Sequence, residues 1–239
     1  MFLDPKNGPE FDLPPAGDVR TYAVASLPRT GSTLLCRGLW DTGLCGAPKE
    51  YLNPMQRRDW GLRAGRRHYR LLMGPLQVLA RGDIQEHLAE VRARRSSGGW
   101  FGLKIHRHHY ERFRDLLAVD RWVLITRRDR LAQAVSWARA IQTGRWASWQ
   151  KGLLPPVYSR SRIARCLEQI EGAEAAWRAE LGEVHEVVYE DLVEDFEATL
   201  GSVLEHLELP PPATLPAPSL SRQADALSER WVERYQAGS

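Results

Sequence analysis

The sequence predicts an α/β fold in which a central, mostly parallel sheet is flanked by helices. Short apolar segments of strand length alternate along the chain with longer segments of helical period, a pattern typical of parallel α/β sheets. The 239 residues, 43% of them hydrophobic and 26% charged, are enough to bury a substantial core, and no linker or internal repeat divides them. We therefore expect one domain over residues 21–239, preceded by a flexible, loosely ordered lead at residues 1–20.

The first strand and helix are the clearest elements. Residues 21–27 (TYAVASL) are small, apolar and prone to β structure, and the next four residues interrupt them. Residues 32–42 then carry two leucines one helical turn apart, with Gly43 as a stop. The sequence thus predicts a strand, a tight turn and a helix in direct succession.

Three further strands and several helices follow this unit. A helix that starts at Asp129 has an apolar stripe of period 3.6 from Leu131 to Ile141. Residues 55–96 are polar and helical but repeatedly interrupted by glycine. The remaining strands are expected at 100–106, 121–127 and 186–189, and the remaining helices at 161–181, 191–207 and 224–235.

The composition excludes a disordered chain, a collagen-like repeat and a coiled coil. No apolar run approaches the ~18 residues of a membrane helix, and the charged, proline-containing N-terminus does not resemble a signal peptide. Three cysteines, an odd number without a CxxC pair, favour free thiols and a cytoplasmic location. We expect neither a disulfide framework nor a transmembrane segment.

Basic residues are almost all arginine, since only four of the 33 are lysine, although the net charge is a modest +3. Arginine forks onto phosphate and sulfate in a way that lysine does not. Residues 57–70 hold six arginines against one aspartate. This density has two interpretations: a solvated helix face, or a partner that carries several negative charges.

The turn after the first strand carries the strongest chemical signal. Its residues are Pro28, Arg29, Thr30, Gly31, Ser32 and Thr33. Glycine permits close backbone approach, and the free N–H groups of a helix N-terminus bind anions, to which hydroxyls and an arginine add donors and charge. The turn lacks the GxxxxGK[ST] pattern and its lysine, so it is not a Walker A loop. The sequence therefore predicts an anion cradle of another type.

The segment ASLPRTGSTLLCRGLWDTG, followed by GAPKEYLNP, resembles the cytosolic sulfotransferases, and most closely the bacterial branch of the trehalose 2-sulfotransferase (Stf0) type. The resemblance extends over most of residues 21–237, through FGLKIH, ITRRDRLAQAVSWARAIQTGRW, VVYEDL and SRQAD…ERWVERY. It implies a P-loop-like sulfotransferase fold, the donor 3′-phosphoadenylyl sulfate (PAPS) and the product adenosine 3′,5′-bisphosphate (PAP). The implied acceptor is a hydroxyl of a carbohydrate or glycolipid, and the bacterial relatives imply a homodimer.

The resemblance also implies a set of donor-binding residues. The turn binds the 5′-phosphosulfate, through Arg29, Thr30, Gly31, Ser32 and Thr33. A strand-end arginine and a serine on the next helix hold the 3′-phosphate; the arginine is Arg127 or Arg128, and the serine is Ser136. A ring at the end of the fourth strand lies beside the adenine and a late loop closes over the nucleotide; the matching residues are Tyr189, then Arg222 and Gln223.

Sulfuryl transfer needs a base, because the acceptor hydroxyl must lose its proton as it attacks sulfur. The resemblance assigns this role to Glu50, in the loop after the first helix, and places Arg29 and Lys104 at the reacting group as catalytic cations. A lysine inside an apolar strand is costly unless it faces a pocket or an anion, which is an independent reason to single out Lys104. His106 lies two residues further on the same strand face; we expect it to line the acceptor pocket, and it is the next candidate for the base.

Three other interpretations are weaker. A kinase-like P-loop enzyme would need the missing Walker lysine, and a non-enzymatic nucleic-acid-binding protein would use residues 57–70, which carry no recognisable reader motif. His106, His108 and His109 invite a metal site, but they lack partner acids at suitable spacing and nearby arginines would repel a cation. We therefore expect no metal and no nucleic-acid partner.

Overall fold

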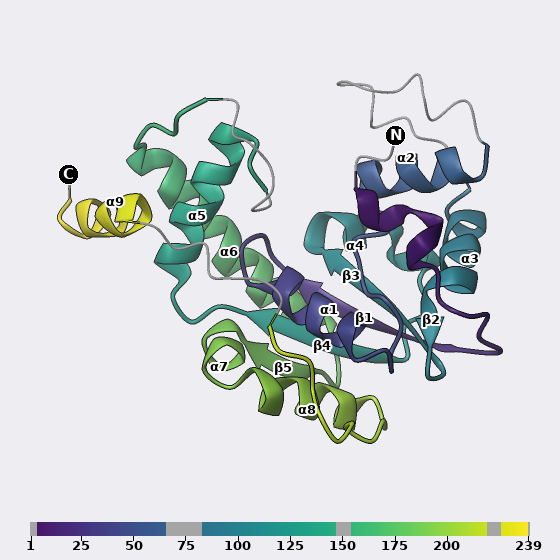
Figure 1. The fold of residues 1–239 in the computed structure, drawn as a ribbon. Coiled ribbons are helices and arrows are strands. Elements are labelled where there is room, and N and C mark those ends of the chain that lie inside the picture. Colours follow the sequence, from purple (N-terminus) through teal and green to yellow (C-terminus); the bar gives the residue numbers. More distant parts are fainter. Residues whose placement is uncertain (1–3, 66–82, 147–153, 219–225, 239) are drawn as a thin grey trace.

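The described part of the chain forms a five-stranded sheet in the order β2-β3-β1-β4-β5 (Figure 1). The computed structural model describes residues 4–65, 83–146, 154–218 and 226–238. The strands are β1 (Arg20–Ser26), β2 (Ser96–Ser97), β3 (Trp100–His106), β4 (Arg121–Thr126) and β5 (His185–Val188). Among these strands β2 alone runs antiparallel, so the expected α/β fold with a mostly parallel sheet is confirmed.

Parallel pairing brings the carboxyl ends of the four longer strands to one edge of the sheet. Ser26 at the end of β1 pairs with His106 at the end of β3, and Thr126 at the end of β4 pairs with Val188 at the end of β5. Ligands of open α/β sheets bind outside these ends. The turn after β1, with its predicted anion cradle, begins at this edge.

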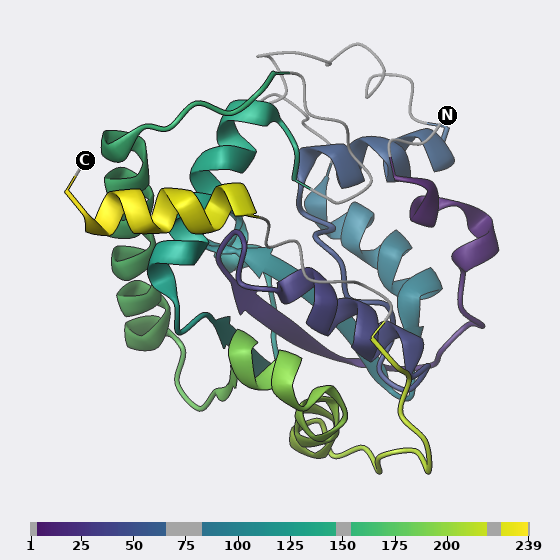
Figure 2. The ribbon, with the colours of Figure 1, turned by 60° about the vertical axis from the view of Figure 1, so that its left-hand side comes forward.

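Helices cover both faces of the sheet (Figures 1 and 2). The described helices are α1 (Ser32–Asp41), α2 (Pro54–Arg63), α3 (Ile84–Arg95), α4 (Arg107–Phe113), α5 (Arg130–Thr143), α6 (Arg160–Glu180), α7 (Tyr189–Glu194), α8 (Phe196–His206) and α9 (Ala226–Gln236). Alternate residues of β1 point to opposite faces: Tyr22 and Val24 pack with α1 and α8, and Ala23 and Ala25 with α2 and α3. A third apolar cluster joins α5, α6 and α9. No helix in the described part is long and apolar enough to cross a bilayer.

Two predicted elements differ from the structure at the carboxyl-end edge. The helix expected at 191–207 is divided into α7 and α8, because the Asp195 carboxylate accepts the N–H of Ala198 and caps a new helix. Tyr189 begins α7 instead of ending the fourth strand. In the polar stretch 55–96, the described residues form α2 and α3, and residues 66–82 lie outside the described residues.

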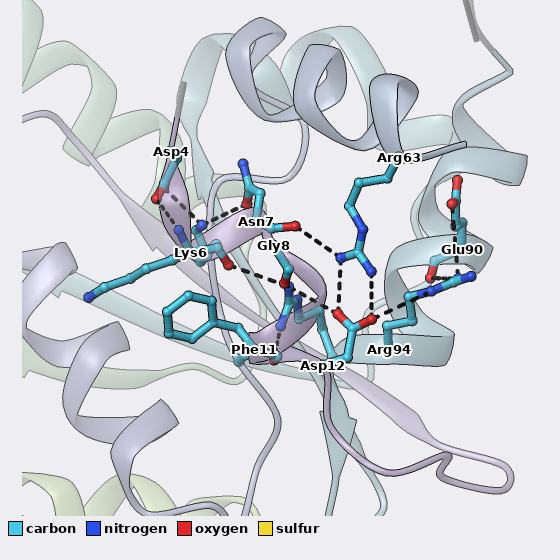
Figure 3. A network of polar contacts seen from close by, with 12 residues as sticks. Asp4, Lys6, Asn7, Gly8, Phe11, Asp12, Arg63, Glu90 and Arg94 are labelled. Carbon is cyan, nitrogen blue, oxygen red and sulfur yellow. Dashed lines mark hydrogen bonds and ion pairs between the residues drawn. The ribbon is translucent and has the colours of Figure 1, made fainter. Parts of the chain in front are cut away.

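Residues 4–12 pack against α2 and α3, which differs from the loosely ordered lead that was expected (Figure 3). Asp12 accepts two bonds from the Arg63 guanidinium, at 3.0 and 2.5 Å, and the fully buried Arg95 donates to the Gly8 carbonyl at 3.1 Å. The prolines that suggested disorder instead begin two short 3-10 helices, Pro5–Asn7 and Pro9–Phe11. The partners of this segment lie far along the chain, where local sequence patterns do not reveal them.

Candidate functional site

The turn between β1 and α1 contains two residues in the left-handed region. Arg29 has φ +67° and Gly31 has φ +79°. A Cβ on Gly31 would also lie 2.2 Å from Cδ2 of Tyr189. Glycine is therefore required here both for the backbone conformation and for the close approach of the aromatic ring.

The same turn presents the start of α1 to the carboxyl-end edge of the sheet. Thr30 is fully buried, and its hydroxyl donates to the Leu27 carbonyl at 3.0 Å, which fixes the turn from within. Ser32 and Thr33 are the first residues of α1. The first N–H groups of a helix have no acceptor within it, so this turn has the donors of an anion site.

Arg29 reaches from the turn to the helix that follows β4. Its Nε donates to the Ser136 hydroxyl at 2.9 Å, and its terminal nitrogen donates to the Trp146 carbonyl at 2.8 Å. Burial lowers the pKa of Arg29, and the neighbouring Arg127 cation lowers it further. The Arg29 guanidinium thus lies close to a second guanidinium and to a hydroxyl, and this concentration of donors and positive charge favours anion binding.

The two strand-end arginines occupy different environments. The Arg127 side chain is 13% exposed, and its guanidinium lies 4.9 Å from the centre of the Tyr189 ring and 3.7 Å from Glu190. The Arg128 side chain is 62% exposed and pairs with Asp191 at 2.7 Å. Both residues follow the end of β4 at Thr126, and of the two only Arg127 lines the cavity beside the turn.

Glu50 is the centre of an ion-paired cluster on the other side of the turn. Its Oε1 lies 2.7 Å from Lys104 Nζ and 3.2 Å from His106 Nε2, and Asn53 donates to its Oε2 at 3.1 Å. Burial raises the pKa of Glu50, but Lys104 and His106 outweigh burial and hold that pKa well below 4.5, the usual value. The carboxylate is therefore ionised and fixed in direction, and it can accept a proton.

Lys104 and His106 link this cluster to the first strands. Lys104 Nζ also donates to the Thr33 hydroxyl at 3.0 Å, so one ammonium contacts both the anion turn and Glu50. The His106 Nδ1 lies 3.1 Å from the Ser26 hydroxyl at the end of β1. Both side chains leave the same face of β3, as their spacing predicts.

The described residues enclose a cavity of about 2020 Å³ in which these groups meet. The sequence-predicted residues that line it are Arg29, Gly31, Ser32, Thr33, Glu50, Lys104, His106, Arg127, Ser136 and Tyr189. Thr30 is buried inside the turn, and Arg128 lies outside the lining. Arg222 and Gln223 lie outside the described residues. The described residues contain no group of three His, Cys, Asp or Glu side chains that could hold a metal ion.

The sequence did not single out Asn53, and it indicated His108 and His109 only as a metal site that was rejected, yet all three line the cavity. Asn53 donates to Glu50 and also caps α2 by accepting the N–H of Met55; an Asn-Pro pair before a helix is the signal for this cap. His108 and His109 line the cavity with ring centres 3.9 Å apart. Burial lowers the pKa of His109 to about 3, assisted by the neighbouring His108, so this ring is neutral near pH 7.

Comparisons with known proteins identify the family and the fold of the chain. A model of the Stf0 sulphotransferase family matches residues 21–119 and 106–238. The trehalose 2-sulfotransferase of Mycolicibacterium smegmatis is 30% identical over 90% of this chain and 93% of its own, and that of Mycobacterium tuberculosis is 28% identical over 92% and 95%. A sulfotransferase structure from Alicyclobacillus acidocaldarius has a TM-score of 0.52 at 14% identity, covering 93% of this chain and 96% of its own. The sulfotransferase domain from the curacin biosynthetic pathway has a TM-score of 0.50 at 16% identity, covering 89% and 82%. These two structures confirm the expected sulfotransferase fold.

Proposed function

This chain belongs to the Stf0 sulfotransferase family and is a sulfotransferase, and on that premise we propose that it transfers the sulfuryl group of PAPS to a hydroxyl of a carbohydrate or glycolipid acceptor. The names of the two mycobacterial relatives support a carbohydrate. The three cysteines are free and buried, which fits the reducing cytoplasm as the place of the reaction.

The observation that carries this proposal is the position of Lys104 between the anion turn and Glu50. One ammonium contacts Thr33 at 3.0 Å and the Glu50 carboxylate at 2.7 Å, so a proton acceptor lies within one side chain of the proposed donor site. Sulfuryl transfer needs little covalent help and depends on positioning and on neutralising the leaving group. The cavity offers both.

The reaction then proceeds by in-line displacement at sulfur. The acceptor oxygen forms a bond to sulfur, the bond from sulfur to the bridging phosphate oxygen breaks, and PAP leaves. Glu50 takes the hydroxyl proton. Arg29, Lys104 and the N–H groups at the start of α1 neutralise the charge that develops on the leaving phosphate.

The nucleotide part of the donor is held by cavity residues that follow β4 and β5. We assign the 3′-phosphate to Arg127 and Ser136, because both line the cavity and Arg127 lies close enough to Arg29 to lower its pKa, whereas Arg128 lies outside the lining, is exposed and pairs with Asp191. Tyr189, stacked against Arg127, contacts the adenine. Arg222 and Gln223 follow from the family resemblance alone, as a loop over the nucleotide.

The test is transfer of radiolabelled sulfate from PAPS to a panel of sugars and glycolipids that includes trehalose. Labelled product from at least one hydroxyl acceptor, with release of PAP, is expected. A parallel measurement compares the melting temperature with PAP, with ATP and magnesium, and with an oligonucleotide. Stabilisation by ATP or by the oligonucleotide instead of PAP would favour the kinase-like or the nucleic-acid-binding alternative and would contradict the proposal.

A further inference from the structure

Residues 4–12, named here the N-terminal strap, reach the cavity that contains Glu50. Asp4, Pro5 and Lys6 line that cavity. The match to the Stf0 family model begins at residue 21, so the family match does not account for the strap. The strap therefore lies outside the matched residues and reaches the site where the acceptor is proposed to bind.

Lys49, the residue before Glu50, connects the strap to the proposed base. Its ammonium lies 2.8 Å from Asp4 Oδ2 and donates to Asn7 Oδ1 at 2.8 Å. The Lys49 side chain is only 12% exposed. An ammonium so buried is costly without its partners, so Asp4 and Asn7 determine where this side chain lies.

The backbone of Lys49 is held from the opposite direction by β3. Its carbonyl accepts the N–H of Lys104 at 2.9 Å, in a parallel bridge between Lys49 and Leu103. The Glu50 carboxylate then meets Lys104 Nζ. Lys49 is thus held by the strap through its side chain and by the sheet through its backbone. It directly precedes Glu50, the proposed base.

The strap is itself anchored on α2 by a buried carboxylate. Asp59 is fully buried and accepts the N–H of Asp4 at 2.9 Å and the Asn7 amide at 3.0 Å. Helix α2 begins at Pro54, and its cap, Asn53, donates to Glu50. The strap, the start of α2 and the Glu50 loop therefore form one connected polar unit (Figure 3 shows its strap side).

We propose that the N-terminal strap positions Glu50 through the Asp4–Lys49 ion pair, which makes Lys49 a positioning residue for proton removal from the acceptor. This inference rests on the proposed role of Glu50. The Asp4–Lys49 pair acts on the loop that carries Glu50 and not on the turn after β1, so we expect donor affinity to be unchanged.

The test compares Lys49→Met and Asp4→Asn with the control Asp12→Asn. Asp12 belongs to the same strap and is as exposed as Asp4 (25% and 26%), but it pairs with Arg63 and Arg95. The readouts are kcat with an active acceptor, PAP affinity, melting temperature and amide hydrogen exchange of a peptide that spans residues 47–53. Both test variants should lower kcat about ten-fold and speed that exchange, with PAP affinity unchanged. Lys49→Arg should keep most of kcat.

The control should lower the melting temperature while it changes kcat by less than about two-fold. Unchanged kcat and exchange in Asp4→Asn, which alters the pair most conservatively, would overturn the inference even if Lys49→Met does not fold. An equal loss of kcat in Asp12→Asn would also overturn it, because the strap would then act on stability alone. Failure of the proposed function is distinguishable: wild-type protein would transfer no sulfate, or Glu50→Gln would be fully active, whatever the exchange at 47–53.

Discussion

The two halves of the cavity hold their cations differently. The proposed donor half, formed by the turn after β1 and the residues after β4, contains arginines near a hydroxyl, a carbonyl, an aromatic ring and one carboxylate. The proposed acceptor half, formed by β3 and the loop before α2, contains lysines in closer pairs with carboxylates. Arg29 donates to Ser136 and Trp146, and Arg127 lies over the Tyr189 ring with Glu190 3.7 Å away. Lys104 instead pairs with Glu50, and Lys49 with Asp4. Two neighbouring guanidinium groups can attract an incoming anion, whereas the Glu50 carboxylate, held by Lys104, is oriented to take a proton.

The largest loss of rate should follow a substitution in the proposed acceptor half, at the residue proposed to take the proton. Glu50→Gln keeps the size of the side chain but removes its ability to take a proton, so the rate should fall by roughly 10²–10⁴. PAP binding should be unchanged, because the donor half is intact. Single-turnover kinetics and calorimetry on the same variant check both statements; an unaltered rate would move the base to another group, with His106 first.

Loss of a cation from the proposed donor half should lower turnover less than loss of the proposed base does. Arg29→Ala removes a donor at the proposed leaving phosphate, and turnover at saturating PAPS should fall by about 10²–10³. A steady-state assay with excess PAPS measures this. A rate near that of the wild type would contradict the role of the turn.

A glycine pair separates backbone strain from crowding in the donor half. Gly31→Ala places a methyl group against Tyr189, at a left-handed φ of +79°. Gly43→Ala imposes a similar φ of +71° with no atom within 4 Å of the new Cβ. Strain of this kind costs ~1–3 kcal/mol at either site, but only Gly31→Ala should weaken PAP binding, by about ten-fold. Equal affinities in the two variants would contradict the proposed nucleotide position.

The pH dependence tests the ion pair that distinguishes the acceptor half. The pKa of Glu50 is held well below 4.5, so the carboxylate stays ionised between pH 7 and 5 and its titration should not limit the rate there. Lys104→Met removes the main opposing charge and leaves burial, which raises the pKa. The acidic limb of kcat/KM should then move up by about one pH unit or more. An acidic limb that stays in place would show that Lys104 does not control Glu50.

Local sequence patterns indicated more of the turn after β1 than of the cluster around Glu50. The turn after β1 is continuous in sequence, so its glycine, hydroxyls and arginine indicated an anion cradle directly. The pairing of Glu50 with Lys104 joins residues 54 positions apart, and family resemblance assigned each one without predicting their contact. Arg127 and Arg128 could not be distinguished in the sequence, because they are adjacent and only their surroundings in the folded chain differ. The strap was misjudged for the same reason: its anchors on α2 and α3 are distant in sequence.

Whether the donor half binds the two phosphates of PAPS is the central question, and calorimetry with PAP and with adenosine 5′-monophosphate tests it most directly. The two ligands differ by the 3′-phosphate that we assign to Arg127 and Ser136. Wild-type protein should bind PAP about 10²–10³ times more tightly, since a buried arginine–phosphate fork with a hydroxyl is worth a few kcal/mol. Arg127→Ala should remove most of that difference, and Arg128→Ala should leave it within about two-fold. Equal affinity of the wild-type protein for both ligands would contradict PAPS as the donor.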